Sequence, residues 1–285
     1  ASQSYNWKMN TEVTQKVIIA DDSNALRVVL SSFFKELGYS VVSLLKDGVN
    51  VLQNVERYDA DIVCLDYHMP KKDGLETLKD LHEQYPDVAV VMITGDENPE
   101  IHEIATELGA DGFITKPFSQ DQIAAEMKKV SSALNSIKRI RKNSFDHSTK
   151  VSDKTAVIVD DSETMRRLLQ VILEDIGINV VGEGLNGQQA IDLVKEKVPD
   201  LLCMDIEMPV KDGISALAEI KGLYPEVQVI MITSLGDKKT VVDAIQKGAS
   251  GYILKPYDPE LVEKEIQKVL SDSTVDDIDS LFDPA

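Results

Sequence analysis

The sequence predicts an α/β fold made of two domains in tandem, each a doubly wound sheet of five parallel strands in the order 2-1-3-4-5. Three observations support this prediction. The chain repeats itself once, each copy alternates the patterns of strands and helices, and each copy places acidic, hydroxyl and basic residues after its apolar runs. A length of 285 residues also suits two domains of ordinary size.

The internal repeat defines the domains. The segment VIIADDS at 17–23 returns as AVIVDDS at 156–162, and the same displacement of 139 positions relates Asp66 to Asp205 without a gap. Such a period is much longer than the roughly 20–50 residues of solenoid repeats, so it indicates duplicated domains. The resulting division is an N-terminal segment 1–14, domains at 15–131 and 154–270, a linker 132–153 and an acidic tail 271–285.

Apolar runs and helical patterns alternate along each copy. The first copy predicts strands at 17–20, 40–43, 61–65, 88–93 and 112–115. The apolar face of the first helix comprises Leu26, Val29, Leu30, Phe33, Phe34 and Leu37, and that of its copy comprises Met165, Leu168, Leu169, Ile172, Leu173 and Ile176. Gly38 and Gly177 follow these helices, where glycine commonly ends a helix. This alternation predicts a parallel sheet covered on both faces.

The composition narrows the classes of function. The 49 acidic and 30 basic residues give a net charge of −19, which disfavours binding to nucleic acid or to an anionic membrane. No apolar run approaches the ~20 residues that span a bilayer. The first ten residues lack the apolar stretch of a signal peptide, so we expect a cytoplasmic protein without membrane insertion.

Two local features each allow a structural and a functional interpretation. Cys64 and Cys203 occupy equivalent positions in apolar runs, so buried free thiols are expected, with a redox site as the alternative. The basic run KRIRK at 138–142 is interpreted either as a solvated face of the linker or as an electrostatic dock. Such a dock would bind the protein's own acidic surface or a partner.

Chemically active side chains follow the predicted strands. Asp21 and Asp22 follow the first strand of the first copy, Asp66 the third, Thr94 the fourth and Lys116 the fifth. The carboxyl ends of parallel strands meet at one edge of a sheet, so these side chains are expected to converge there. The second copy brings together the equivalent residues, which are Asp160, Asp161, Asp205, Thr233 and Lys255.

This combination of residues indicates phosphoryl chemistry. Three carboxylates in one crevice need a compensating charge, and Mg²⁺ with oxygen ligands supplies it. A carboxylate can then attack phosphorus and form an acyl phosphate. The threonine hydroxyl and the lysine ammonium would stabilise the phosphoryl oxygens. The sequence therefore predicts aspartyl phosphorylation with one Mg²⁺ per domain.

Both halves resemble receiver domains of response regulators, the CheY-like family with a flavodoxin-like fold. The matching motifs are IIADDS, IVCLDYHMPKKDG, VVMITG and DGFITKPF in the first half, and VIVDDS, LLCMDIEMPVKDG, VIMITS and SGYILKPY in the second. The resemblance implies that Asp66 and Asp205 accept phosphoryl groups from a sensor histidine kinase or a phosphotransfer protein.

The resemblance also implies roles for the surrounding residues. Mg²⁺ would be held by Asp21, Asp22, Asp66 and the backbone carbonyl of His68, and in the second half by Asp160, Asp161, Asp205 and the backbone carbonyl of Glu207. The phosphoryl group would be bound by Thr94 and Lys116, and by Thr233 and Lys255. Phe113 and Tyr252 would rotate inward as switch residues, with plain core packing as the alternative. The Lys116–Pro117 and Lys255–Pro256 bonds would be cis.

The two sites differ two residues after each nucleophile. A metal-ligating imidazole at His68 is disfavoured because no second histidine lies nearby in the sequence. Glu207 adds a carboxylate to the second site only. We therefore predict different lifetimes for the two acyl phosphates.

The acidic tail has two interpretations. Its apolar residues Ile278, Leu281 and Phe282 follow a helical spacing and resemble the docking peptides by which flagellar switch proteins and phosphatases bind CheY-like receivers. The alternative is a disordered tail. In the first case the tail would bind one receiver of the same chain or recruit a partner.

The resulting prediction is a tandem-receiver signalling protein without an output domain, in a chemotaxis or motility pathway. It would act through phosphorylation-dependent contact with a downstream protein, or through intramolecular or homodimeric receiver–receiver contact, and would not be an enzyme beyond slow reaction with small phosphodonors. One alternative is the regulatory part of a larger effector, such as a cyclic-dinucleotide synthase. A haloacid-dehalogenase-type phosphohydrolase is disfavoured because His68 and Glu207 stand where that family has an acid/base aspartate.

Overall fold

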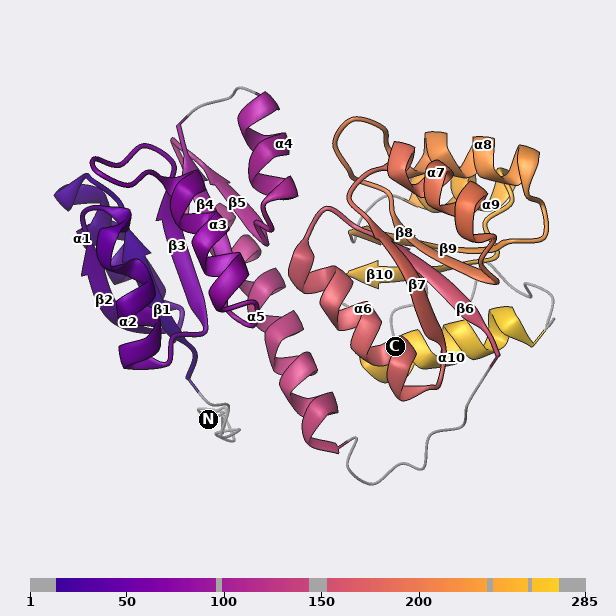
Figure 1. The fold of residues 1–285 in the computed structure, drawn as a ribbon, viewed down its shortest axis with the longest axis horizontal. Coiled ribbons are helices and arrows are strands. Elements are labelled where there is room, and N and C mark those ends of the chain that lie inside the picture. The colour runs from indigo at the N-terminus through magenta and orange to yellow at the C-terminus, as the bar shows by residue number, and fades with distance from the viewer. Residues whose placement is uncertain (1–13, 96–98, 144–152, 235–237, 256–257, 272–285) are drawn as a thin grey trace, which may run out of the picture.

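The computed structural model describes residues 14–95, 99–143, 153–234, 238–255 and 258–271 (Figure 1). The described residues form two domains, each with one sheet of five parallel strands. The first sheet has the order β2-β1-β3-β4-β5 and the second the order β7-β6-β8-β9-β10. Both orders match the predicted 2-1-3-4-5 arrangement.

The strands and helices of the first domain alternate along the chain. The strands are β1 (Lys16–Ala20), β2 (Ser40–Leu45), β3 (Ile62–Asp66), β4 (Ala89–Thr94) and β5 (Gly112–Thr115). The helices are α1 (Asn24–Glu36), the short 3₁₀ helix η1 (Gly48–Asn50), α2 (Val51–Tyr58), α3 (Gly74–Gln84), α4 (Pro99–Glu107) and α5 (Gln120–Asn143).

The second domain repeats this order. Its strands are β6 (Thr155–Val159), β7 (Asn179–Gly184), β8 (Leu201–Asp205), β9 (Gln228–Ser234) and β10 (Gly251–Lys255). Its helices are α6 (Glu163–Asp175), α7 (Gly187–Lys197), α8 (Gly213–Leu223), α9 (Lys238–Gln246) and α10 (Pro259–Leu270).

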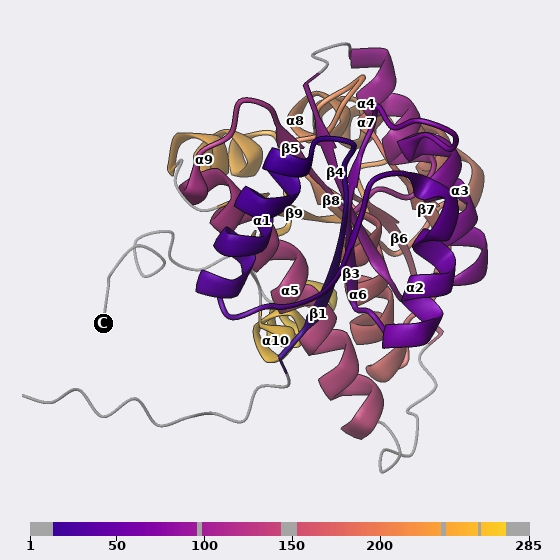
Figure 2. The ribbon, with the colours of Figure 1, turned by 90° about the vertical axis from the view of Figure 1, so that its left-hand side faces the viewer.

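Helices cover both faces of each sheet, as Figure 2 shows for the first domain. There α1 and α5 pack on one face, and α2, α3 and α4 contribute to the core on the other. In the second domain α6 and α10 pack on one face, opposite α7, α8 and α9. The central strands β1, β3, β4, β6 and β8 are buried almost throughout, which explains why they read as continuous apolar runs rather than as alternating ones, whereas the edge strands β2 and β7 are only half-buried.

Helix α5 extends beyond the first domain and packs on the second. It continues to Asn143, so it occupies the first half of the segment 132–153. Its residues Ala133, Ile137 and Ile140 belong to the same buried cluster as the face of α6. Figure 1 shows α5 lying beside α6 between the two sheets. The two domains are therefore joined by a shared apolar core.

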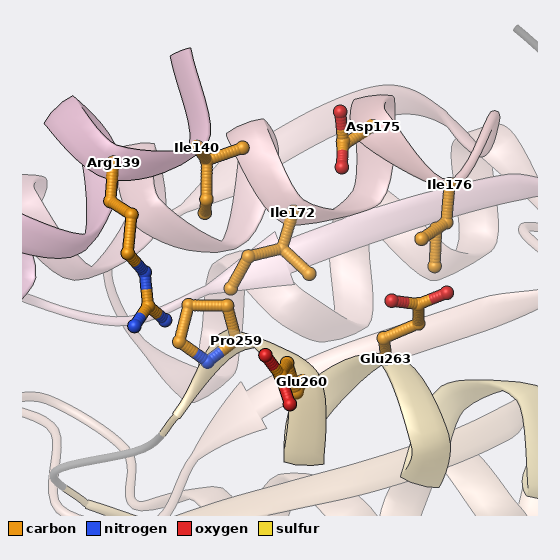
Figure 3. A pocket seen from close by; sticks show the side chains of 8 residues that line it. All are labelled: Arg139, Ile140, Ile172, Asp175, Ile176, Pro259, Glu260 and Glu263. Atoms are coloured by element: carbon orange, nitrogen blue, oxygen red, sulfur yellow. The ribbon is translucent and has the colours of Figure 1, made fainter. Parts of the chain in front are cut away.

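A cavity of about 250 Å³ lies where α5, α6 and α10 meet (Figure 3). Arg139 of α5, Ile172 of α6 and Pro259 of α10 line it. None of the side chains predicted for phosphoryl chemistry contributes to its wall.

The basic run of α5 pairs with acidic residues of both domains. Lys138 contacts Asp61, and Arg141 Nη1 lies 3.0 Å from the Asp87 carboxylate. Arg139 lies 3.8 Å from Asp258 of the second domain. These contacts favour the interpretation of the run as a dock for the protein's own acidic surface.

The predicted apolar face of the first helix is only partly buried. In α1, Leu30 and Phe34 are buried, whereas Val29 is 40% exposed and Leu37, which follows the helix, is 37% exposed. In α6, Leu168, which is equivalent to Val29, is 2% exposed. Both helices lie against their own sheets, but α5 packs on α6 in addition and so buries more of its surface.

Two further sequence predictions concern burial. Cys64 and Cys203 are free and buried, as predicted, and burial raises the pKa of the Cys203 thiol to about 12. Among the helices that the structure describes, none combines the length and the apolar character needed to cross a membrane.

Candidate phosphorylation and metal sites

The ends of three strands bring the first set of charged side chains together. Asp21 follows β1, Asp66 ends β3 and Lys116 follows β5. The Lys116 ammonium lies 2.9 Å from Asp21 Oδ2 and 2.8 Å from Asp66 Oδ1. The predicted convergence at the carboxyl edge of the sheet is therefore present in the first domain.

The second domain has the same arrangement. The Lys255 ammonium lies 2.7 Å from Asp160 Oδ2 and 2.7 Å from Asp205 Oδ2. This site is more enclosed than the first, because the Lys255 side chain is 6% exposed and that of Lys116 is 22% exposed. Asp161 is half-buried, whereas its equivalent Asp22 is exposed.

Local backbone structure orients these carboxylates. Asp21 Oδ1 accepts a hydrogen bond of 2.8 Å from the backbone N–H of Ser23, and Asp160 Oδ1 accepts one of 2.9 Å from that of Ser162. Gly74 lets α3 begin against the nucleophile, because a Cβ there would lie 2.4 Å from the Asp66 carbonyl oxygen. Gly213 has the same role beside Asp205, where the corresponding distance is 2.1 Å.

Each site holds a group of three carboxylates. One oxygen from each of Asp21, Asp22 and Asp66 can be chosen such that all three lie within 4.8 Å of one another. The same is true of Asp160, Asp161 and Asp205. Hard divalent cations such as Mg²⁺ take oxygen ligands, so these donor sets fit the predicted metal. The predicted contributions of the His68 and Glu207 carbonyls remain predictions.

Burial and mutual repulsion make these carboxyl groups easier to protonate. Desolvation, followed by the charge of Asp160, raises the pKa of Asp205 to about 7. The same two effects raise the pKa of Asp161 to about 6. Burial also raises the pKa of Asp66. A cation bound among the carboxylates would offset this repulsion.

The two lysines stay charged between their carboxylate partners. Burial alone would lower their pKa values, but the hydrogen bonds and charges of the neighbouring aspartates outweigh it. The pKa values of both Lys116 and Lys255 are therefore raised. Each lysine supplies one permanent positive charge to its site.

The predicted phosphoryl-binding threonines lie on the strand next to each nucleophile. Asp66 of β3 pairs with Ile93 of β4, and Thr94 is the next residue. Asp205 of β8 likewise pairs with Ile232, which precedes Thr233. Both threonines are buried. Their placement agrees with the prediction, while their contact with a phosphoryl group remains a prediction.

The predicted switch residues are half-buried. Phe113 stacks on His102 of α4 with ring centroids 3.6 Å apart, and it packs against the core on one face of the first sheet. Tyr252 packs against the equivalent core of the second domain. Both environments are consistent with core packing as well as with a switch. The stacking partner His102 was not predicted, because it lies in a helix with no distinctive motif.

The remaining predictions concern the two lysine–proline bonds and the acidic tail, and only one of these bonds lies within the described residues. The Lys116–Pro117 bond is cis, as predicted. Pro256 lies outside the described residues, and so do the tail residues Ile278, Leu281 and Phe282.

Comparison with known proteins identifies the family. The family model described as the response regulator receiver domain matches residues 17–128 and 156–267. The chain therefore belongs to the response regulator receiver family and contains two receiver domains, called receiver 1 and receiver 2 below.

Individual relatives match about two-fifths of the chain. The chemotaxis proteins CheY of Bacillus subtilis and Halobacterium salinarum are 44% and 43% identical to it over 115 and 118 residues. These matches cover 40% and 41% of this chain and 96% and 98% of the relatives.

Two solved structures are also partly similar to this chain. The Vibrio cholerae chemotaxis protein CheY4 is 28% identical, with a TM-score of 0.38 over 39% of this chain and 94% of that chain. A putative two-component system response regulator/GGDEF domain protein is 19% identical, with a TM-score of 0.40 over 91% of this chain and 99% of that chain.

Proposed function

We propose that the protein is a tandem-receiver response regulator that accepts phosphoryl groups on Asp66 and Asp205. The observation that carries this proposal is the duplicated site, in which each predicted nucleophile lies beside two further carboxylates and a buried or half-buried lysine. Receiver domains accept phosphoryl groups from histidine kinases, so the donor is a sensor histidine kinase or a phosphotransfer protein carrying phosphohistidine.

The chain's own residues account for the transfer. A carboxylate oxygen of Asp66 or Asp205 forms a bond to phosphorus while the bond from phosphorus to the donor's imidazole nitrogen breaks. Lys116 or Lys255 is already hydrogen-bonded to the nucleophile, so its ammonium is placed to stabilise the phosphoryl oxygens. Thr94 or Thr233 lies at the end of the adjacent strand and supplies a hydroxyl.

The three carboxylates of each site are the proposed Mg²⁺ ligands. Asp21 and Asp22 would hold it in receiver 1, and Asp160 and Asp161 in receiver 2, together with the nucleophile. When bound, the ion supplies positive charge that offsets the charge of the carboxylates and of the transferred phosphoryl group.

The output is proposed to be a change in protein contacts. The 44% identity to a chemotaxis protein favours a chemotaxis or motility pathway, in which phosphorylation changes the affinity for a downstream protein of the flagellar-switch or phosphatase type. The predicted docking tail would strengthen such a contact.

The proposal is tested by locating the phosphate. The protein is incubated with acetyl phosphate and Mg²⁺, and borohydride then reduces any acyl phosphate to homoserine. Peptide mass spectrometry is expected to find homoserine at positions 66 and 205, and not when Mg²⁺ is replaced by EDTA. Homoserine at other aspartates, or at none, would contradict the proposal.

A further inference from the structure

The start of α6 in receiver 2 is docked on receiver 1 beside β5. Asp111, which precedes β5, is 4% exposed and accepts a hydrogen bond of 2.6 Å from the backbone N–H of Thr164. The Thr164 hydroxyl donates to the same carboxylate oxygen. The Ser162 hydroxyl donates to the backbone carbonyl of Asp111 over 3.0 Å. The loop that carries Asp160 and Asp161 is thus held against receiver 1.

The residues of this contact distinguish the two receivers. The residue equivalent to Asp111 in receiver 2 is Ser250, and the residue equivalent to Thr164 in receiver 1 is Ala25. Ser250 has no carboxylate and Ala25 has no hydroxyl, so this pair cannot form the hydrogen bond that joins Asp111 and Thr164. The contact is therefore specific to this pair of surfaces and is not a consequence of the receiver fold itself.

A cavity of about 220 Å³ lies between the docked receivers, and the second phosphoacceptor opens into it. Receiver 2 contributes Asp161, Asp205 and Lys255 to its wall, and receiver 1 contributes Phe113, Glu126 and Lys129. The Asp205 site is therefore completed by side chains of the other receiver. This explains why Asp161 is half-buried whereas its equivalent Asp22 is exposed.

Lys129 is the cation that receiver 1 adds to this wall. It lies 4.0 Å from Glu126 Oε1, which also lines the cavity. Its side chain lines the same cavity as Asp161 and Asp205 of receiver 2, so its charge acts across the interface. Lys268, the equivalent residue of receiver 2, lies on α10 and is not part of this wall.

We propose that Lys129 of receiver 1 is a binding residue of the second phosphorylation site, where it attracts the anionic phosphodonor to Asp205. This inference rests on the proposed function of Asp205 and extends it. An anion that enters the cavity meets carboxylates on both walls, and Lys129 offsets part of that charge from outside the receiver that is phosphorylated. Phosphorylation of Asp205 thereby depends on the docking of receiver 1.

The test measures the rate of Asp205 labelling when the charge at position 129 is reversed. All proteins are full-length and carry Asp66→Asn, so that only Asp205 reacts with acetyl phosphate and Mg²⁺, and intact mass gives the initial rate. We expect Lys129→Glu to slow labelling roughly tenfold and Lys129→Arg to keep the parent rate, because the charge that lines a cleft changes association rates by at least such factors.

Three matched controls separate a local effect from a general one. Lys128→Glu changes the net charge equally at an exposed neighbouring position and should leave Asp205 labelling unchanged. Lys129→Glu, measured at Asp66 in an Asp205→Asn protein, should leave labelling unchanged and so show that receiver 1 is intact. Lys268→Glu in the same Asp205→Asn protein should also leave Asp66 labelling unchanged.

The outcomes distinguish the inference from the proposed function. An Asp66→Asn parent that takes up no phosphate contradicts the proposed function of Asp205. A parent that is labelled, together with a Lys129→Glu variant labelled at the same rate, overturns the inference alone. Equal slowing by Lys128→Glu and Lys129→Glu also overturns it, because the effect would then reflect net charge.

Discussion

The Lys255 ammonium lies 2.7 Å from the Asp205 carboxylate in a site where both side chains are almost fully buried. Asp160 Oδ2 lies at the same distance from the ammonium group. One lysine thus compensates two buried carboxylates. The equivalent Lys116 pairs with the equivalent aspartates, Asp21 and Asp66, but is more exposed, so solvent screens its contacts more strongly.

This relationship predicts different costs for removing the two lysines. Lys255→Met leaves two buried carboxylates uncompensated and should lower the free energy of unfolding of receiver 2 by about 3 kcal/mol in EDTA. Lys116→Met should lower the free energy of unfolding of receiver 1 by less. Urea unfolding followed by circular dichroism measures both, with the exposed Lys128→Met as the control. Equal losses for the two lysines would contradict this interpretation.

The raised pKa of Asp205 predicts how metal-free stability depends on pH. The pKa is about 7 in the folded chain, above the ordinary value of 3.8 for an aspartate, so near neutral pH the folded state binds a proton that the unfolded state releases. The stabilisation from this group is complete below pH of about 4 and is lost as pH rises through about 7. Asp205→Asn cannot lose a proton, so it should raise Tm by about 3 °C at pH 8 and hardly at pH 4.

Thermal unfolding in EDTA at the two pH values tests this prediction. An equal increase in Tm at both values would show that Asp205→Asn acts through packing and not through charge.

The environment of Glu207 predicts a shorter lifetime for the acyl phosphate at Asp205 than for that at Asp66. Glu207 lines the cavity next to the second phosphoacceptor, whereas His68 occupies the equivalent position of receiver 1. A carboxylate beside the phosphate can accept a proton from the attacking water. Decay should therefore be several-fold faster in Asp66→Asn than in Asp205→Asn, and Glu207→Gln should slow it. Equal decay rates, measured by intact mass after removal of the donor, would refute the difference.

The contact between Asp111 and Thr164 predicts a stability effect that spans the two receivers. Thr164→Val keeps the shape of the side chain but removes a hydroxyl from a buried carboxylate, so it should lower the free energy of unfolding by about 1–3 kcal/mol. Ser215→Ala removes a hydroxyl that bonds Asp212 at the surface and should have little effect. Equal effects of the two substitutions in urea unfolding would show that the interdomain bond contributes nothing specific.

The repeat explains why much of the fold and of each site could be predicted from the sequence. The loops keep their lengths in both copies, so the sequence alone places Asp66 and Asp205, with their lysines, at the carboxyl edges of two sheets. The burial of α1 was less predictable. The helical spacing includes Val29 equally with Leu30, but only contact with other elements decides which side chains are buried.

The docking of the two receivers could not be predicted from the repeat. Asp111 and Thr164 come from different copies, and no local pattern shows that they meet. The available signal lay in departures from the repeat. Ser250 replaces Asp111, Ala25 replaces Thr164, and α5 continues to Asn143 with apolar residues at 133, 137 and 140, whereas α10 ends at Leu270.

The number of working phosphoacceptors tests the assignment of Asp66 and Asp205 most directly. Intact mass after incubation with acetyl phosphate and Mg²⁺ should be measured for the wild type, Asp66→Asn, Asp205→Asn and the double variant. We expect two added phosphoryl groups in the wild type, one in each single variant and none in the double variant. Labelling that persists in the double variant, or a wild type that takes up no phosphate, would contradict the assignment of Asp66 and Asp205 as phosphoacceptors.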